Sequence, residues 1–161
     1  MGVSGCGKST LGALLAAALD CPFLEGDDYH SLAAIAKMRG GEPLDDADRW
    51  PWLDRLGAAT AAAVSGHGAA VTACSALRRS YRDRLRATIG WPVRLVLLEN
   101  SRERLLERLA ARPGHFMPLS LIDSQLATLE RPSTDEDALV LATETPAEAL
   151  LGDVLARLRI G

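Results

Sequence analysis

Residues 2–10 carry the clearest chemical signal in the chain, because they match the pattern G-x-x-x-x-G-K-[ST] in full. Glycines at this spacing let successive backbone N–H groups turn toward an anionic phosphate chain, and the helix that follows directs its positive end to the same place. In such a loop Lys8 reaches the β- and γ-phosphates, and the Ser9 hydroxyl holds Mg²⁺. A glycine-rich turn that only caps a helix would explain neither the lysine nor the glycine spacing. The motif therefore predicts a nucleotide site formed by Gly2, Ser4, Gly5, Cys6, Gly7, Lys8, Ser9 and Thr10.

Two carboxylates in the stretch 23–30 are the next candidates for chemistry. Residues two apart on a strand project to one face, so Glu25 and Asp27 are expected to face the same space at the carboxyl end of a strand, where open α/β sheets bind ligands. One carboxylate can hold Mg²⁺ while the other accepts a proton from an attacking hydroxyl. The alternative is a solvated acidic turn in which Asp27 or Asp28 caps the next helix. The neighbouring phosphate loop favours the chemical interpretation, with Glu25 at the metal and Asp27 as general base.

The elements that must position these groups alternate between helix and strand. Strands are expected at residues 22–25, 69–75, 93–98 and 139–142, and helices at 8–19, 31–39, 49–65, 79–89, 101–112, 119–130 and 146–158. The run 93–98 is apolar throughout, as is typical of a parallel strand buried on both faces. Asp48 is the expected N-cap of the helix that begins near Arg49, with Pro51 in its first turn. The alternation predicts one α/β domain over residues 1–161, with helices on both faces of a parallel sheet.

The composition narrows the range of partners. The 161 residues include 18 Lys and Arg and 21 Asp and Glu, for a net charge of −3. Nucleic acid is therefore not an expected partner. The sequence shows no signal peptide and no apolar run long enough to cross a membrane, so no membrane partner is expected. The three cysteines have no metal-ligand spacing, which favours a reducing, cytoplasmic location, and Cys6 is expected to fill space inside the phosphate loop.

Two longer blocks follow the acidic stretch. Residues 37–53 read Lys-Met-Arg-Gly-Gly-Glu-Pro-Leu-Asp-Asp-Ala-Asp-Arg-Trp-Pro-Trp-Leu, and residues 74–86 read Cys-Ser-Ala-Leu-Arg-Arg-Ser-Tyr-Arg-Asp-Arg-Leu-Arg. Together with Arg-Pro-Gly-His-Phe at residues 112–116, the chain resembles the gluconokinases, small P-loop kinases that phosphorylate D-gluconate at its 6-hydroxyl with ATP. The resemblance covers residues 2–116 in order and continues more weakly toward the C-terminus. It departs from the family pattern at Glu25, where Asp is usual, so the metal geometry is expected to differ slightly.

The resemblance implies ATP and Mg²⁺ as cofactors and gluconate as the small-molecule substrate. Because gluconate is a polyol with one carboxylate, its site should offer cations together with hydrogen-bonding groups. The implied substrate residues are Asp27, His30, Lys37, Asp48, Arg49, Arg78, Arg82 and His115. Arg86 is instead expected on a solvated basic helix face.

Related small kinases also carry a helical lid that closes over ATP and excludes water. The resemblance places this lid at about residues 104–130, and implies that Arg108 and Arg112 reach the transferring phosphoryl group. Arg104 is expected to pair with Glu103 or Glu107 on its own helix. Pro146, after the last strand, is implied as part of the wall of the adenine site. The family further suggests a homodimer.

The resemblance implies a five-stranded sheet of order 2-3-1-4-5, in which the first strand carries the phosphate loop. Only Met1 precedes Gly2, so the first strand is missing from this sequence. Unpaired buried backbone groups cost on the order of 1–3 kcal/mol each, compared with a typical stability of roughly 5–15 kcal/mol. We therefore expect the natural product to begin upstream of Met1, with an apolar strand of about five residues.

Three alternatives to a gluconate kinase remain open at this point. A kinase for another small acid, such as shikimate or adenylylsulfate, would leave residues 48–53 unexplained. A nucleotide-binding protein without turnover, regulatory or disabled by the missing strand, would bind ATP and transfer nothing. A GTPase switch is disfavoured, because no N-K-x-D motif for guanine is present in the sequence.

Overall fold

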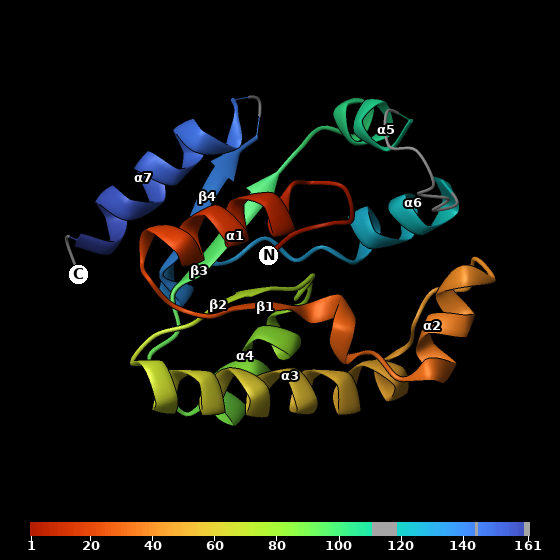
Figure 1. Cartoon of the computed structure of the whole chain (residues 1–161). Coiled ribbons are helices and arrows are strands. Elements are labelled where there is room, and N and C mark those ends of the chain that lie inside the picture. Colours follow the sequence, from red (N-terminus) through yellow and green to blue (C-terminus); the bar gives the residue numbers. More distant parts are fainter. Residues whose placement is uncertain (111–118, 144, 160–161) are drawn as a thin grey trace.

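Parallel strands alternate with helices along the chain, as the sequence pattern predicts (Figure 1). The computed structural model describes residues 1–110, 119–143 and 145–159. Strand β1 (Phe23–Glu25) pairs in parallel with β2 (Val71–Ala73), and β3 (Leu95–Glu99) pairs in parallel with β4 (Ala138–Ala142). Within each pair the last residues lie opposite one another, so the two strands of a pair end at the same edge.

Helices cover both sides of these strands (Figure 1). Helix α1 (Lys8–Ala18) packs against α7 (Ala147–Arg159) on one side, and α3 (Asp46–His67) packs against α4 (Arg79–Ile89) on the other. The shorter helices α2 (Leu32–Arg39), α5 (Arg102–Ala110) and α6 (Leu119–Thr128) all lie toward the right-hand side of the view in Figure 1. Two 3₁₀ turns, η1 (Gly26–Tyr29) and η2 (Thr134–Glu136), complete the described elements. The predicted α/β fold is confirmed, with bounds that differ from the expected ones by a few residues.

Met1 and Gly2 lie between the two strand pairs. The Met1 ammonium donates to the Val96 carbonyl at 2.6 Å, and the Met1 carbonyl accepts from the Leu98 N–H at 3.0 Å. On the other side, the Gly2 N–H donates to the Ser75 carbonyl at 3.1 Å. The order in space is therefore β1, β2, residues 1–2, β3 and β4. These two residues occupy the position that the first strand has in the order 2-3-1-4-5.

Two buried apolar clusters fill the layers. One contains Val3 and Cys6 of the phosphate loop together with Leu98, Leu105 and Ile122, which come from β3, α5 and α6. The other lies between α3 and α4. Cys6 is fully buried, as expected for a space-filling side chain. The phosphate loop is therefore part of the core, and its backbone is held by packing on one side.

The start of α3 differs from the sequence prediction. Asp45, and not Asp48, is the N-cap, and its carboxylate accepts from the Asp48 N–H at 2.9 Å. The Asp48 carboxylate accepts from the Asp45 N–H in return at 3.2 Å, which completes a capping box. The reciprocal pair begins the helix at Asp46, so Pro51 lies beyond the first turn, where its ring leaves one helical hydrogen bond unmade.

Candidate active site

The phosphate loop adopts the conformation that its glycines allow. Gly2, Gly5 and Gly7 have φ angles of 138°, 81° and 100°, a region that favours glycine. A Cβ on Gly2 would lie 2.8 Å from the Leu98 carbonyl oxygen. Gly7 is the N-cap of α1 and offers no capping side chain, so the first-turn N–H groups of this 11-residue helix can serve an anion. The loop therefore fits a phosphate group.

Lys8 is placed over this loop. Its Nζ donates to the Val3 carbonyl at 2.9 Å, so the ammonium lies close to the loop backbone. Ser9 and Thr10 follow on the exposed first turn of α1. This arrangement brings one cation and two hydroxyl-bearing residues to the side of the loop where the helix begins.

Glu25 and Asp27 lie at the carboxyl end of β1, but the predicted strand alternation does not reach Asp27. The strand ends at Glu25 and the chain enters η1, so Glu25 is placed by the strand and Asp27 by a 3₁₀ turn. A hydrogen bond attaches this turn to α3, because the Gly26 carbonyl accepts from Trp52 Nε1 at 2.7 Å. The cap of α2 is Ser31, whose hydroxyl accepts from the Ala34 N–H at 3.1 Å. The alternative role of Asp27 or Asp28 as that cap is therefore wrong.

The phosphate loop and the acidic residues lie at one edge of the strands. Glu25 ends β1 opposite Ala73, the last residue of β2, and the Gly2 N–H donates to the Ser75 carbonyl just beyond β2. The two groups therefore meet at the carboxyl end of the β1–β2 pair. Cys74 is buried at this edge, and its burial raises the pKa of the thiol.

His30 lies beside this edge. Its ring stacks on Trp52 with centroids 4.4 Å apart and planes 12° apart. Burial lowers the pKa of His30, and Asp27 acts in the opposite direction. Its Nδ1 is buried and has no hydrogen-bond partner among the described residues. A neutral imidazole with an unused nitrogen suits a hydroxyl-bearing ligand.

Two arginines surround one aromatic ring near His30. The guanidinium carbons of Arg49 and Arg78 lie 5.5 and 5.7 Å from the centroid of Tyr81. The Tyr81 hydroxyl donates to Asp46 at 2.5 Å, and Arg78 donates to the same carboxylate at 3.2 Å. Burial and the hydrogen bond to Asp46 raise the pKa of Tyr81 to about 12, so the phenol stays protonated. The cluster has two cations and one carboxylate, which leaves a positive excess for an anionic ligand.

Arg49 is the less satisfied of the two cations. Its Nε donates to the Leu44 carbonyl at 3.2 Å, and no carboxylate among the described residues forms an ion pair with it. Burial lowers the pKa of Arg49, and the neighbouring Arg78 lowers it further. A ligand carboxylate would oppose both effects, because its negative charge would raise the pKa of Arg49.

Lys37 and Asp48, both expected at the substrate, contact each other. Lys37 Nζ donates to the two carboxylate oxygens of Asp48 at 2.7 and 3.0 Å. This hydrogen bond raises the pKa of Lys37 and lowers the pKa of Asp48. The pair connects the last turn of α2 to the first turn of α3, close to Arg49.

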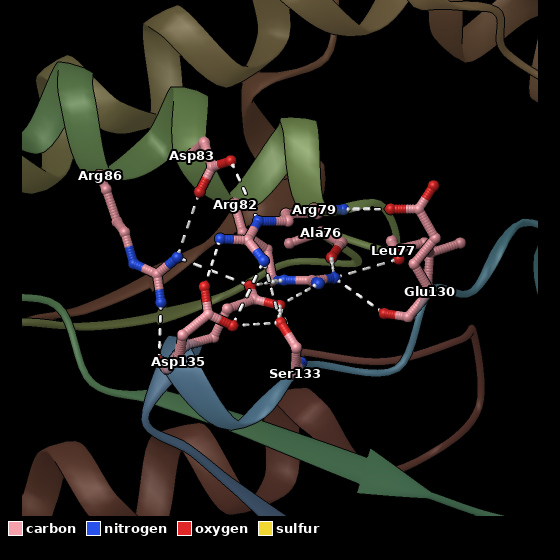
Figure 2. A network of polar contacts seen from close by, with 10 residues as sticks. Ala76, Leu77, Arg79, Arg82, Asp83, Arg86, Glu130, Ser133 and Asp135 are labelled. Carbon is pink, nitrogen blue, oxygen red and sulfur yellow. Dashed lines mark hydrogen bonds and ion pairs between the residues drawn. The ribbon is translucent and has the colours of Figure 1, made fainter.

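Arg82 is not available to a substrate, and this corrects the sequence prediction. Its side chain is 1% exposed and forms a two-bonded ion pair with Glu136, at 2.5 and 2.7 Å. The remaining N–H groups donate to the backbone carbonyls of Leu77 and Glu130, at 3.2 and 3.0 Å, and more weakly to that of Ala76 (Figure 2). A buried guanidinium with all of its directions used by the protein has a structural role. The Asp27 carboxylate, in contrast, has no ion-pair partner among the described residues.

Arg86 is also drawn into this network and not left on a solvated face. It is half-buried, donates to the Glu136 carbonyl at 2.8 Å and pairs with Asp83 at 3.3 Å (Figure 2). Arg79, at the exposed rim, pairs with Asp135 at 2.6 Å. Helix α4 is thereby fixed to residues 130–136 along its length, which sets the position of Arg78 and Tyr81 at its start.

Arg108 connects the phosphate loop to the segment after β4. Its guanidinium donates to the Cys6 carbonyl at 3.2 Å and to the Thr143 carbonyl at 2.8 Å. Pro146 lies exposed three residues later, at the start of α7. Arg104 pairs with Glu107 at 2.8 Å, as expected. The predicted site residues Arg112 and His115 lie outside the described residues.

A magnesium ion would be held here by few protein groups. Ser9 and Glu25 are the residues predicted for it, and no group of three His, Cys, Asp or Glu side chains suited to a metal occurs in the part of the chain that the structure describes. Mg²⁺ in phosphoryl-transfer sites is bound through one or two side chains together with substrate phosphates and water. The donor set therefore fits an ion that arrives with a nucleotide.

Three residues at the site, Asp46, Tyr81 and Asn100, were not predicted from the sequence. Asp46 and Tyr81 organise the two arginines, and Asn100 and Thr143 meet beside the phosphate loop. Asn100 directly follows β3, so the rule that ligands bind at the carboxyl ends of parallel strands could have found it. Asp46 carries no such signal, because its role depends on the approach of α4 to α3.

Comparison with known proteins agrees with this geometry. The sequence matches the profile of the AAA domain family over residues 1–132, and the fold with its phosphate loop defines a P-loop kinase. The gluconokinase of Gluconobacter oxydans (strain 621H) is 46% identical over 159 residues, covering 96% of this chain and 86% of that protein. The thermosensitive gluconokinase of Escherichia coli (strain K12) is 44% identical over 141 residues, covering 87% and 74%. The chain belongs to the gluconokinase family.

Solved structures extend the comparison. A gluconokinase from Sinorhizobium meliloti 1021 superposes with a TM-score of 0.89 at 43% identity, covering 99% of this chain and 89% of that chain. An APS kinase from Mycobacterium tuberculosis, at 20% identity and a TM-score of 0.69, shares the fold. None of the helices within residues 1–110, 119–143 and 145–159 is both long and apolar enough to span a bilayer.

The buried pair of Arg82 and Glu136 yields a stability prediction. Replacing Glu136 with Gln leaves the guanidinium buried without a counter-charge, which costs about 3–5 kcal/mol of unfolding free energy. The hydrogen bond from Arg82 holds the pKa of Glu136 down at about 2. A lowered carboxyl pKa stabilises the fold fully above its unfolded value, and this contribution is lost as the pH falls toward the folded value. The deficit of Glu136→Gln should therefore shrink as the pH falls from about 5 toward 2.

Urea unfolding of both proteins across this pH range measures the effect. Asp135→Asn is the matched control, because Asp135 is 59% exposed and its pair with Arg79 should contribute about 0–1 kcal/mol. Equal losses for the two variants, or a Glu136→Gln deficit that does not change with pH, would contradict the structural role of the pair.

Proposed function

We propose that this chain transfers the γ-phosphoryl group of ATP to the 6-hydroxyl of D-gluconate. Family membership supports the reaction, and one observation in the structure supports the acceptor. Arg49 and Arg78 lie around Tyr81 with a single carboxylate, that of Asp46, and Tyr81 shares a buried cluster with Trp52, on which His30 stacks near Asp27. An anionic group held by the arginines would place the rest of a polyol chain along His30 and Asp27.

The groups at the phosphate loop would act on the donor. Lys8 carries a positive charge to the migrating phosphoryl group, and the loop N–H groups hold the phosphate chain. Ser9 and Glu25 would hold Mg²⁺, which shields the negative charge of the phosphates when bound. Arg108 contacts the Cys6 carbonyl within the loop, so a modest side-chain movement would bring its guanidinium to a phosphate oxygen.

The groups at the end of β1 would act on the acceptor. Asp27 is exposed and directly follows the strand, where its carboxylate can accept the proton of the attacking hydroxyl. His30 can exchange a hydrogen bond with a neighbouring hydroxyl through its unused Nδ1. Arg49 and Arg78 would hold the carboxylate of gluconate, while Lys37 and Asp48 position the start of α3 from which Arg49 projects.

Membership of the gluconokinase family supports further proposals on the lid, the adenine contact, the location and the oligomeric state. We propose that residues 104–130 form the lid, with Arg112 and His115 contributing from it, and that Pro146 lies against the adenine. We further propose that the chain acts in the cytoplasm as a homodimer, which light scattering of the purified protein would refute if only the monomer mass were found.

An ADP-release assay tests the reaction. ADP should form only when gluconate and Mg²⁺ are both present, and Lys8→Ala should lower kcat by about 10²–10³-fold, since its charge acts on the transferring group. The assay should include shikimate and other sugar acids as acceptors. ADP release with shikimate but not with gluconate would show that the acceptor is wrong, and ATP binding without any turnover would favour a nucleotide-binding role.

Arg49 provides the sharper test of the acceptor site. Arg49→Gln should raise KM for gluconate by about 10–100-fold, because a charge-assisted hydrogen bond contributes about 1.5–3 kcal/mol, while KM for ATP stays near the wild-type value. Arg84→Gln is the matched control on α4, since Arg84 pairs with Asp54 on the surface at 2.6 Å. Equal KM values for gluconate in Arg49→Gln and wild type would remove Arg49 from the carboxylate site.

A further inference from the structure

Helix α6 brings a neutral amide to the phosphate loop. Ile122 is buried in the same cluster as Val3 and Cys6, so this part of the helix packs directly on the loop. Gln125 lies about one turn further on, and its Oε1 accepts from the Ser4 N–H at 2.7 Å. The contact joins residues separated by 121 positions in the sequence. It is a short, direct hydrogen bond between α6 and the loop.

The partner of this amide is one of the loop's own N–H groups. Ser4 lies between Gly2 and Gly5, in the series of backbone N–H groups that turns toward a phosphate. A glutamine amide has two ends, because Oε1 accepts hydrogen bonds while Nε2 donates them. With Oε1 on the Ser4 N–H, the same side chain carries two N–H donors beside the place where a phosphate chain would lie.

The far end of α6 is tied to the acceptor side. The Glu130 N–H donates to the Leu77 carbonyl at 2.8 Å, and the Glu130 carboxylate accepts from the Arg79 N–H at 2.6 Å (Figure 2). These bonds hold the residues after α6 at the first turn of α4, next to Arg78. The position of Gln125 is therefore fixed from both ends, by the loop and by α4.

We propose that Gln125 is a phosphate-contacting residue that distinguishes ATP from ADP. Its Oε1 holds the Ser4 N–H, and its Nε2 donates to the terminal phosphate group of bound ATP. The proposal rests on the part of the proposed function that places ATP in the loop, and it is independent of gluconate. A carboxylate at this position would keep the acceptor for Ser4 but would lose both donors and repel the phosphate.

Gln125→Glu separates this role from a purely structural one. If Gln125 only fixes the loop through Ser4, the Glu variant keeps the required acceptor and binds nucleotides as the wild type does. If Nε2 contacts the terminal phosphate, the variant should bind a non-hydrolysable ATP analogue about 10–100-fold more weakly, as expected for a hydrogen bond to a charged group. Its affinity for ADP should change by less than about threefold, a change of under 1 kcal/mol.

The experiment is a calorimetric titration of each protein with ADP and with the analogue, in the presence of Mg²⁺. Asp123→Asn is the matched control, since Asp123 lies on the exposed side of α6 and pairs with Arg102 at 2.7 Å. Gln125→Met serves as a second variant if the Glu variant does not fold. It keeps the length of the side chain and removes both donors together with the acceptor for Ser4, so a loss of loop structure would weaken ADP and the analogue equally, whereas the loss of a phosphate contact would weaken the analogue alone. A loss confined to the ATP analogue supports the proposal. Unchanged affinities, or equal losses for ADP and the analogue, would overturn it.

A failure of the proposed reaction would be recognised separately. Wild-type protein that binds the ATP analogue more tightly than Gln125→Glu does, yet releases no ADP with gluconate, would retain this inference and reject the acceptor. If the wild type turns over with gluconate and the Gln125→Glu variant binds both nucleotides normally, the proposed reaction would stand and the inference about Gln125 would be overturned.

Discussion

The position of the phosphate loop between the two strand pairs is the constraint on which the rest of the site depends. Backbone hydrogen bonds from Met1 reach β3, and the Gly2 N–H reaches Ser75 just beyond β2. Buried Val3 and Cys6 then pack the loop into the core, where a side chain on Gly2 would collide with the Leu98 carbonyl. Because both pairs are parallel, the groups after β1, β2 and β3 gather near one loop. Glu25, Asp27 and Asn100 reach the same region for this reason.

Three arginines near the candidate site differ in burial and in role. Arg82 is buried and fully bonded to Glu136 and to backbone carbonyls, so it organises the protein. Arg49 and Arg78 lie around Tyr81 with a single carboxylate, so the protein leaves part of their hydrogen-bonding capacity unused. Arg82 fixes α4 to residues 130–136, and Arg78, at the start of α4, depends on that helix for its position. The acceptor site that we propose therefore depends on a buried ion pair that does not itself contact the substrate.

Much of this arrangement could be predicted from the sequence, and the reasons differ by residue. Patterns within one segment predict local structure. The glycine spacing of residues 2–10 therefore predicts the phosphate loop, and the apolar run near β3, with the alternation of helices and strands, predicts the α/β fold. The edge that carries Asp27 follows from that fold. The sequence places Arg82 among the cations of the substrate site because it belongs to the block of residues 74–86 that resembles the gluconokinases. Its partner Glu136 lies 54 positions away, and nothing local in the sequence indicates that pairing.

The same limit applies to the capping of α3 and to Gln125. Asp45 and Asp48 are both good caps, and only the reciprocal bonds decide that the helix begins at Asp46. Gln125 is an ordinary polar residue of a helix until Ile122 places that helix on the phosphate loop. Contacts between elements distant in sequence determine these roles, whereas spacing within one element determined the loop.

The identity of the phosphorylated atom tests the central claim most directly. Phosphorus NMR of the product formed from ATP and gluconate reports the carbon that carries the new ester. The account predicts one phosphate monoester whose phosphorus signal is split by the methylene protons of the terminal carbon, because the arginines hold the carboxylate end away from Asp27. An ester on another carbon, or inorganic phosphate as the only new species, would contradict it.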